Sequence, residues 1–165
     1  MEIERKYLVA RLPERLDSFE HVDIEQGYLL SSPTLRIRRM GDDYILTVKE
    51  RIASHSSAIH NREEEFALSA EAYQNLRAKC NDHLVSKTRY KIPLTNADRV
   101  GEQGPQLTAE LDIFHHQLEG LQIVEVEFPD TVLADHFVPP DWFGDDVSDN
   151  PLYRNSNLAK ITQWH

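Results

Sequence analysis

Cysteine, long apolar runs and positive charge are all scarce in this sequence, and each shortage argues against one class of structure or partner. Cys80 is the single cysteine among 165 residues, so no disulfide can form within the chain. Charged residues interrupt every long apolar stretch, so we expect neither a membrane span nor a signal peptide. The net charge of -10 argues against a nucleic-acid groove, which needs a basic surface. We therefore expect a cytoplasmic protein with no nucleic-acid or membrane partner.

The composition that remains favours one compact domain over residues 1–165. Hydrophobic residues make up 40% of the chain, which is enough for a core without disulfides or a structural metal. The chain contains no repeat and no linker that would divide it.

Apolar and polar residues alternate through most of the chain, and this period of two is typical of β-strands. The alternating segments are 1–9, 22–30, 34–40, 44–50, 62–69, 84–94, 106–116 and 121–128. Helices are expected at 70–80, 131–138 and 152–163, with starts marked by Ser69, Asp130 and Pro151. The pattern predicts a mainly β (α+β) fold, either a barrel or a sandwich of antiparallel strands, with helices packed outside.

Charges of one sign recur at positions i and i+2 in these segments. The acidic pairs are Glu2/Glu4, Glu63/Glu65, Glu110/Asp112 and Glu125/Glu127, the basic pairs are Arg36/Arg38 and Lys87/Arg89, and Lys6 and Lys49 stand alone. A period of two places each pair on one face of its strand. Carboxylates about 6.6 Å apart along a strand repel by roughly 0.6 kcal/mol in water, but by about 2.5 kcal/mol at an effective dielectric near 20.

An ordinary solvated face explains any one of these pairs, but the whole set favours a hollow barrel. In such a barrel the charged faces would converge on a shared interior, and the apolar faces would point outward beneath the helices. Carboxylate pairs suit Mg²⁺ or Mn²⁺, and arginine pairs suit phosphate oxygens. We therefore expect Glu2 and Glu4 to hold metal while Lys6 faces an anion beside it.

The ordered set of motifs resembles the CYTH superfamily, the triphosphate tunnel metalloenzymes. The motifs are E-I-E-R-K at 2–6, R-I-R at 36–38, T-V-K at 47–49, K-T-R at 87–89, E-L-D at 110–112 and E-V-E at 125–127. QGYL at 26–29 and YRNSNLA at 153–159 are similar to the small bacterial tripolyphosphatases. The resemblance implies an eight-stranded antiparallel tunnel-like barrel that binds triphosphate with divalent metal.

The resemblance also implies roles for individual residues. Near the metal it places Glu2, Glu4, Glu63, Glu65, Asp112, Glu125 and Glu127, of which Glu2, Glu4 and Glu127 are the expected ligands. The expected phosphate-binding residues are Arg36, Arg38, Lys49, Lys87, Arg89 and Lys160. Lys6 and Tyr28 resemble a paired catalytic site. Glu64 stands between Glu63 and Glu65, so the register of that strand could be shifted by one residue.

These observations predict Mg²⁺- or Mn²⁺-dependent hydrolysis of a small-molecule triphosphate, foremost inorganic tripolyphosphate. Thiamine triphosphatase or adenylate cyclase activity on the same scaffold are alternatives, because the shared motifs bind only the triphosphate. The sequence has no obvious aromatic cluster for a base, which favours the inorganic substrate. A module that binds polyphosphate or nucleotide without turnover is a further alternative, and a homodimer is possible by analogy with the family.

Overall fold

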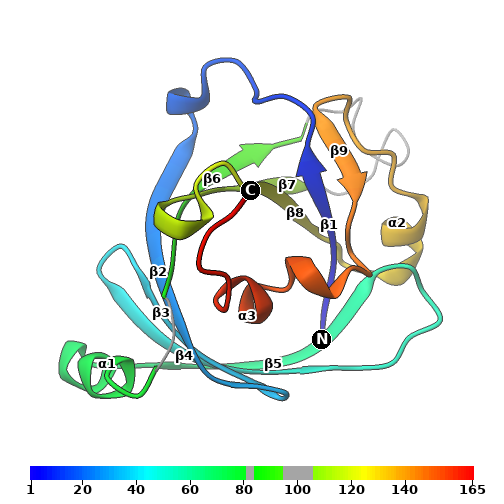
Figure 1. The fold of residues 1–165 in the computed structure, drawn as a ribbon. Coiled ribbons are helices and arrows are strands. Elements are labelled where there is room, and N and C mark those ends of the chain that lie inside the picture. The colour runs from blue at the N-terminus through cyan, green and yellow to red at the C-terminus, as the bar shows by residue number, and fades with distance from the viewer. Residues whose placement is uncertain (81–83, 95–105) are drawn as a thin grey trace.

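A computed structural model describes residues 1–80, 84–94 and 106–165, in which nine strands form one antiparallel sheet (Figure 1). The strands are β1 (Glu2–Val9), β2 (Glu20–Ser31), β3 (Thr34–Met40), β4 (Asp43–Arg51), β5 (Ile59–Ala67), β6 (Val85–Pro93), β7 (Thr108–Phe114), β8 (Gln122–Glu127) and β9 (Phe143–Asp146). Their order is β5-β4-β3-β2-β6-β7-β8-β1-β9, and an additional pairing of β5 with β1 closes eight of them into a barrel. The predicted eight-stranded antiparallel barrel is thereby confirmed.

The first strand closes this barrel. Residues Glu2 to Glu4 of β1 pair with β5, while Glu4 to Leu8 pair with β8. The short strand β9, which the sequence did not predict, pairs with β1 at Tyr7 and Val9, beyond the point where β5 leaves it. β1 therefore bonds to three other strands.

The outer face of the barrel is apolar where helices and loops cover it. Leu111, Val124 and Val126 are fully buried and belong to an apolar cluster with Tyr7 and with Ala134 of α2 (Thr131–His136). Since these residues alternate with charged residues along β7 and β8, the charged residues face inward. Apolar residues thus lie outside the barrel wall and charged residues inside it, as the like-charge pairs predicted.

Two of the predicted helices pack on the outside of the barrel. α1 (Ala70–Arg77) lies against β3 and β4, and the Ser69 hydroxyl caps it by accepting a hydrogen bond of 3.1 Å from the Ala72 amide. α2 begins in the same way, because an Asp130 carboxylate oxygen lies 2.8 Å from the Leu133 amide. Single 3-10 turns occur at η1 (Leu16–Ser18) and η3 (His116–Leu118).

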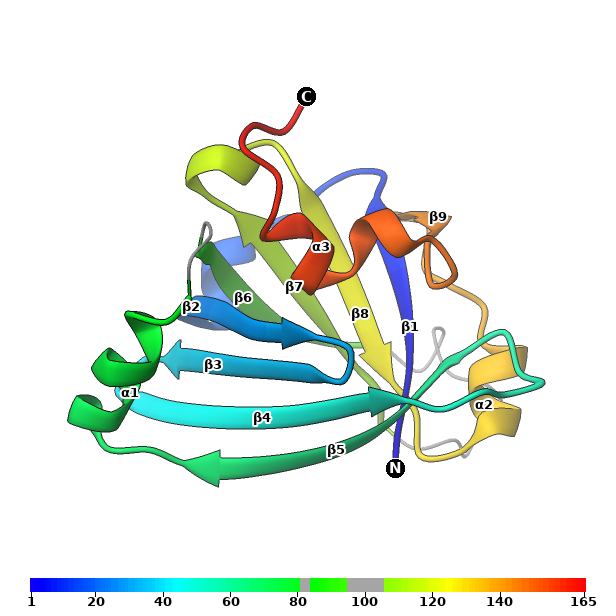
Figure 2. The same cartoon turned by 60° about the horizontal axis from the view of Figure 1, so that its bottom comes forward.

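The prediction of an outer helix at 152–163 was wrong. The segment forms a 3-10 turn η4 (Pro151–Tyr153) and one helical turn α3 (Asn155–Leu158), because Arg154 between them is extended. α3 lies within the outline of the strand ring in Figure 1 and beside β7 and β8 in Figure 2. Its apolar residues pack on inward-facing residues of the barrel wall rather than on the outer face.

We call this inner cluster the apolar plug. It consists of Val85, Phe114, Leu118, Leu121, Ile123, Leu158 and Ala159. Val85 begins β6, Phe114 ends β7 and Ile123 lies near the start of β8, so in these antiparallel strands all three lie at one end of the barrel. The C-terminal segment therefore fills that end. In the described ranges, no helix has the length and apolar character needed to cross a membrane.

Candidate active site

The barrel encloses a cavity of about 620 Å³ whose wall is mainly charged. Its acidic side chains on β7, β8, β1 and β5 are Glu110, Glu125, Glu127, Glu2, Glu4, Glu63 and Glu65. Its basic side chains on β4, β3 and β6 are Lys49, Arg51, Arg36, Arg38, Arg89 and Lys91. The exceptions to this division among the strands are Lys6 on β1 and Glu50 on β4.

The two signs of charge occupy two sides of the barrel. The strands β7, β8, β1 and β5 are neighbours in the closed sheet, and so are β4, β3, β2 and β6. We call these sides the acidic arc and the basic arc. A polyanion between them would meet cationic side chains on one side and carboxylates, which can hold metal ions, on the other.

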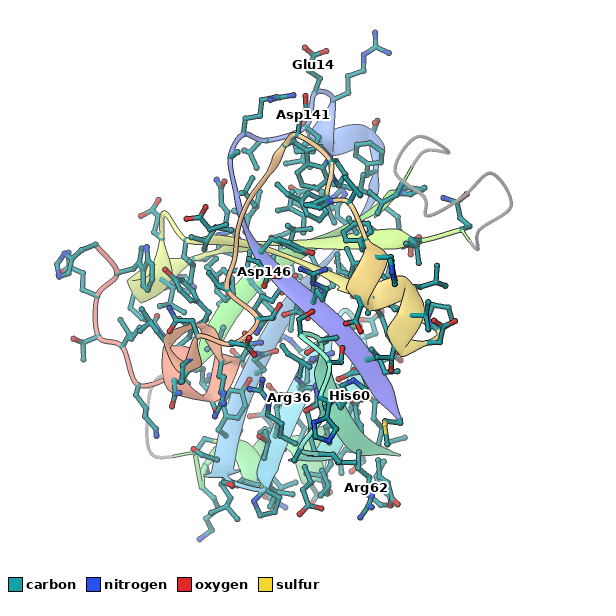
Figure 3. The ribbon with its side chains drawn as sticks, turned by 90° about the vertical axis from the view of Figure 1, so that its right-hand side faces the viewer. Glu14, Arg36, His60, Arg62, Asp141 and Asp146 are labelled. Carbon is teal, nitrogen blue, oxygen red and sulfur yellow. The ribbon has the colours of Figure 1, made fainter. Side chains whose placement is uncertain are left out.

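Arg36 and Arg38 of β3 are buried cations in the basic arc. They are 5% and 9% exposed, and the Nε atom of each is buried with no hydrogen-bond partner among the described residues. An Arg36 amino group donates to the Thr47 hydroxyl at 3.3 Å, and Figure 3 shows Arg36 in the interior while Arg62 projects outward. Burial, together with the like charges of Arg36 and Arg89, lowers the pKa of Arg38 to about 10. Buried cations of this kind favour an anionic ligand.

Lys49 joins the two arcs. Its Nζ atom lies 3.0 Å from a Glu2 carboxylate oxygen and 3.3 Å from a Glu63 oxygen. In the ladder between β4 and β5, Lys49 is opposite Glu63 and Thr47 is opposite Glu65, so both glutamates face inward. Glu64 pairs with Val48 on the outer face, which removes the alternative register.

Carboxylates crowd one another in the acidic arc. Burial, reinforced by the neighbouring Glu125 and Glu2, raises the pKa of Glu4 to about 8. Burial and Glu2 likewise raise the pKa of Glu127, which lies opposite Glu4 in the ladder. In the described part of the chain, no three acidic, histidine or cysteine groups are already gathered as a metal site. The oxygen donors are those that Mg²⁺ and Mn²⁺ use, and a cation would relieve their repulsion.

Lys6 and Tyr28 both line the cavity, but their polar atoms have different partners. The Lys6 ammonium donates to the Tyr153 carbonyl at 2.9 Å and lies 3.5 Å from Glu125. Burial opposes the charge of Glu125, but Lys6, Arg89 and two further lysines hold the pKa of this carboxyl well below its usual range. The Tyr28 hydroxyl accepts a hydrogen bond of 2.8 Å from Gln26.

Asp112 and Lys87 lie behind the cavity wall and not on it. Both are 1% exposed, and the Lys87 ammonium is 2.7 Å from an Asp112 oxygen. Asp112 also accepts two hydrogen bonds from Arg89, at 2.8 and 2.9 Å. Although burial raises the pKa of Asp112, the cations Arg89 and Lys87 outweigh it and the pKa is lowered. In this structure Asp112 therefore holds Arg89 and Lys87, and neither Asp112 nor Lys87 is among the residues that line the cavity.

Other positions also differ from the prediction. Lys160 is exposed and outside the cavity lining, and it lies beyond α3, which ends at Leu158. Glu110 lines the cavity and pairs with Arg89 at 2.8 Å, although the prediction assigned a site only to its neighbour Asp112.

Sequence reasoning missed several further lining residues. They are Asn61, Lys91, Arg51 and Arg154. The period of two, extended backward from Glu63 and onward from Arg89, could have found Asn61 and Lys91. No sequence signal marks Arg154, which follows a turn.

Comparison with known proteins gives concordant results. No family model matches the chain. The chain is 34% identical over 162 residues to an inorganic triphosphatase of Nitrosomonas europaea, covering 96% of each protein. It is 33% identical to an inorganic triphosphatase of Acetivibrio thermocellus, covering 96% of this chain and 93% of that protein.

Solved structures agree with these relatives. The crystal structure of the inorganic triphosphatase NE1496 matches with a TM-score of 0.69 and 31% identity, over 99% of this chain and 97% of the other. HpAC1 from Hippeastrum, a candidate adenylyl cyclase with a dominant triphosphatase activity, shares the fold at a TM-score of 0.52 and 16% identity, over 79% of this chain and 80% of the other. The motifs, the charged barrel interior and these relatives together show that the chain belongs to the CYTH superfamily of triphosphate tunnel metalloenzymes, beside the bacterial inorganic triphosphatases.

Proposed function

We propose that the protein hydrolyses inorganic tripolyphosphate to pyrophosphate and orthophosphate with the help of Mg²⁺ or Mn²⁺. The observation that carries the proposal is the pair Arg36 and Arg38, two buried guanidinium groups in the cavity wall whose Nε atoms have no partner within residues 1–80, 84–94 and 106–165. Two such cations cost stability unless an anion compensates them. A short chain of phosphates provides dense negative charge in the size range of the cavity.

The acidic arc supplies the ligands for the metal. Glu2, Glu4 and Glu127 would hold it, with Glu63, Glu65 and Glu125 close by, since all of these residues line the same cavity. Asp112 is not included, because it is already engaged by Arg89 and Lys87. When bound, a divalent cation would neutralise phosphate oxygens and make coordinated water more acidic.

The cationic side chains of the barrel would bind and orient the phosphates. Arg36, Arg38 and Arg89 would bind the phosphate oxygens and stabilise the charge that spreads over them during transfer. Lys6 is held between Glu125 and the Tyr153 carbonyl, so its ammonium has a fixed position from which to orient the terminal phosphate or the attacking water. One P–O bond forms to water and one anhydride bond breaks, which releases orthophosphate and pyrophosphate.

The relatives support this choice of substrate over the alternatives. Both bacterial relatives named above are inorganic triphosphatases. In the described residues, the cavity lining holds Tyr28 as its only aromatic residue, which offers little stacking surface for a base. This favours the inorganic substrate over ATP or thiamine triphosphate.

The test is phosphate release from tripolyphosphate, ATP and thiamine triphosphate, each with Mg²⁺, Mn²⁺ or chelator. We expect metal-dependent turnover with tripolyphosphate as the best substrate. Arg38→Met should lower kcat/KM by about 100-fold or more, the scale for removing one group that stabilises transition-state charge. Arg39→Met is the matched control, because Arg39 is the next residue on β3 and is exposed on the outer face.

Other outcomes would redirect the proposal. Formation of cyclic AMP and pyrophosphate from ATP would support the cyclase, and preferred turnover of thiamine triphosphate would support that branch. Tight tripolyphosphate binding without turnover under any metal condition would indicate a binding module. Equal losses in Arg38→Met and Arg39→Met would contradict the assignment of the anion site.

A further inference from the structure

Gln26 is a fully buried amide in the wall of the barrel. It is 0% exposed and lies on β2 between Arg38 of β3 and Val85 of β6 in the sheet register. Its Oε1 atom is buried and has no hydrogen-bond partner in the described part of the chain. Burying an amide with one polar end unsatisfied costs free energy. Gln26 is therefore a poor residue for stability at this position, where Met or Leu would suffice.

The other end of the amide contacts a cavity residue. Gln26 Nε2 donates a hydrogen bond of 2.8 Å to the hydroxyl oxygen of Tyr28. Tyr28 lines the cavity and lies opposite Arg36 in the ladder, whereas Gln26 does not reach the cavity. Any effect of Gln26 on a bound anion must therefore pass through another side chain.

The hydrogen bond from Gln26 fixes how the Tyr28 hydroxyl can act. The ring of Tyr28 packs against the apolar plug, and its hydroxyl oxygen is held by the hydrogen bond from Gln26. Because the phenol oxygen already accepts a hydrogen bond from Gln26, its own proton remains available for an acceptor in the cavity. A phosphate oxygen held by Arg36 is such an acceptor.

We propose that Gln26 is a positioning residue, which holds the Tyr28 hydroxyl so that it donates its proton to the triphosphate. The proposal rests on the proposed function for the identity of the anion. It predicts a residue that is kept for activity at the expense of stability.

The test is a double-mutant cycle of Gln26→Met and Tyr28→Phe. We expect Gln26→Met to lower kcat/KM for tripolyphosphate about tenfold, the effect of misdirecting one hydrogen bond to a charged group. Its thermal midpoint should equal or exceed that of the wild type, because the unsatisfied amide is gone. In the Tyr28→Phe background, Gln26→Met should have no further effect on kcat/KM. Gln26→Leu serves as a second apolar variant if Met alters the packing.

A second readout separates this proposal from the proposed function. Calorimetry of tripolyphosphate binding in chelator should show weaker binding in Gln26→Met than in wild type, and no such difference in the Tyr28→Phe background. If wild type binds tripolyphosphate but does not hydrolyse it, the proposed function fails. The binding data then still test whether Gln26 positions the Tyr28 hydroxyl. The inference is overturned if both apolar variants leave binding and turnover unchanged, if they destabilise the fold, or if their effect persists without the Tyr28 hydroxyl.

Discussion

Asp112 is a buried carboxylate whose side-chain partners are cations of the barrel interior. Its two oxygens hold Arg89 in a bidentate pair and also contact Lys87, and the residue is fully buried. The period of two correctly predicted that Asp112 faces inward. The sequence could not show that Phe114, two residues later, belongs to the apolar plug, so that the interior beside Asp112 is filled. Position on a strand gives the face of a side chain but not its depth.

Removal of this charge should therefore affect stability first. In Asp112→Asn, the buried charges of Lys87 and Arg89 lose their shared counter-ion. Breaking a buried ion pair by removing one partner costs about 3–5 kcal/mol, so we expect a drop of this size in the free energy of unfolding. Urea denaturation would measure it. Asp42→Asn, in the exposed turn after β3, should change stability by less than about 0.5 kcal/mol.

Glu25, which lies outside the cavity, makes a contribution to folding stability that depends on pH. It accepts hydrogen bonds from the Tyr73 hydroxyl at 2.8 Å and from Arg77 Nε at 2.9 Å. Burial alone would raise its pKa, but these bonds outweigh burial and the pKa lies below its usual value. A carboxyl with a depressed pKa stabilises the folded state above its unfolded pKa, and this contribution is lost as the pH falls through the folded value.

We therefore expect the stability difference between wild type and Glu25→Gln to be present at pH 7 and to shrink as the pH falls below about 4, near the unfolded pKa of glutamate. Thermal or urea unfolding at several pH values would measure it. A difference that grows with acidification would contradict the sign. Glu71→Gln, an exposed change in the first turn of α1, is a suitable control for the loss of a carboxylate there.

At the scale of elements, the strands could be predicted well because alternation reports directly on burial. Eight of the nine strands have a counterpart in the sequence pattern, and β5 has the register that places Glu63 and Glu65 inside. β9 could not be predicted, because FGDD at 143–146 has too few residues to show a period. The prediction of the last helix failed for another reason. Leu158 and Ala159 are apolar, but the sequence pattern does not distinguish an inner apolar surface from an outer one.

The two faces of β5 provide a direct test of the register. Glu63→Gln removes a charge from the cavity, where Glu63 contacts Lys49, whereas Glu64→Gln removes one from the outer face. We expect the first change to weaken Mn²⁺ binding and to lower kcat/KM about tenfold, the cost of one charge-assisted interaction. Titration of Mn²⁺ by electron paramagnetic resonance would measure the affinity. A larger loss in Glu64→Gln than in Glu63→Gln would show that the strand is shifted.

At the scale of the molecule, the barrel has two unlike ends. The apolar plug occupies one end, and carboxylates such as Glu127 and Glu110 lie toward the other, where β8 ends and β7 begins. The sequence motifs predicted a tunnel-like barrel, and the apolar plug packs inside one end of it. The residues of the apolar plug could not be predicted, since they come from three separated parts of the chain.

A barrel filled at one end should process long phosphate chains only from their termini. With a polyphosphate of many units, we expect slow release of small products from chain ends and no internal cleavage, because the chain cannot thread through the apolar plug. Gel electrophoresis of the remaining polymer would show gradual shortening. Early appearance of fragments of intermediate length would mean that the plug does not obstruct the barrel.

The position of β1 in the sheet has a consequence for folding during synthesis on the ribosome. The strand that carries Glu2, Glu4 and Lys6 is synthesised before the other strands, yet it bonds to β8 and β9, which are synthesised after β2 to β7. Until those strands emerge, β1 keeps most of its backbone groups unpaired, and pairings between such distant segments form slowly. The cavity therefore cannot form in a nascent chain that lacks β8, and a shortened translation product that stops before β8 should be inactive.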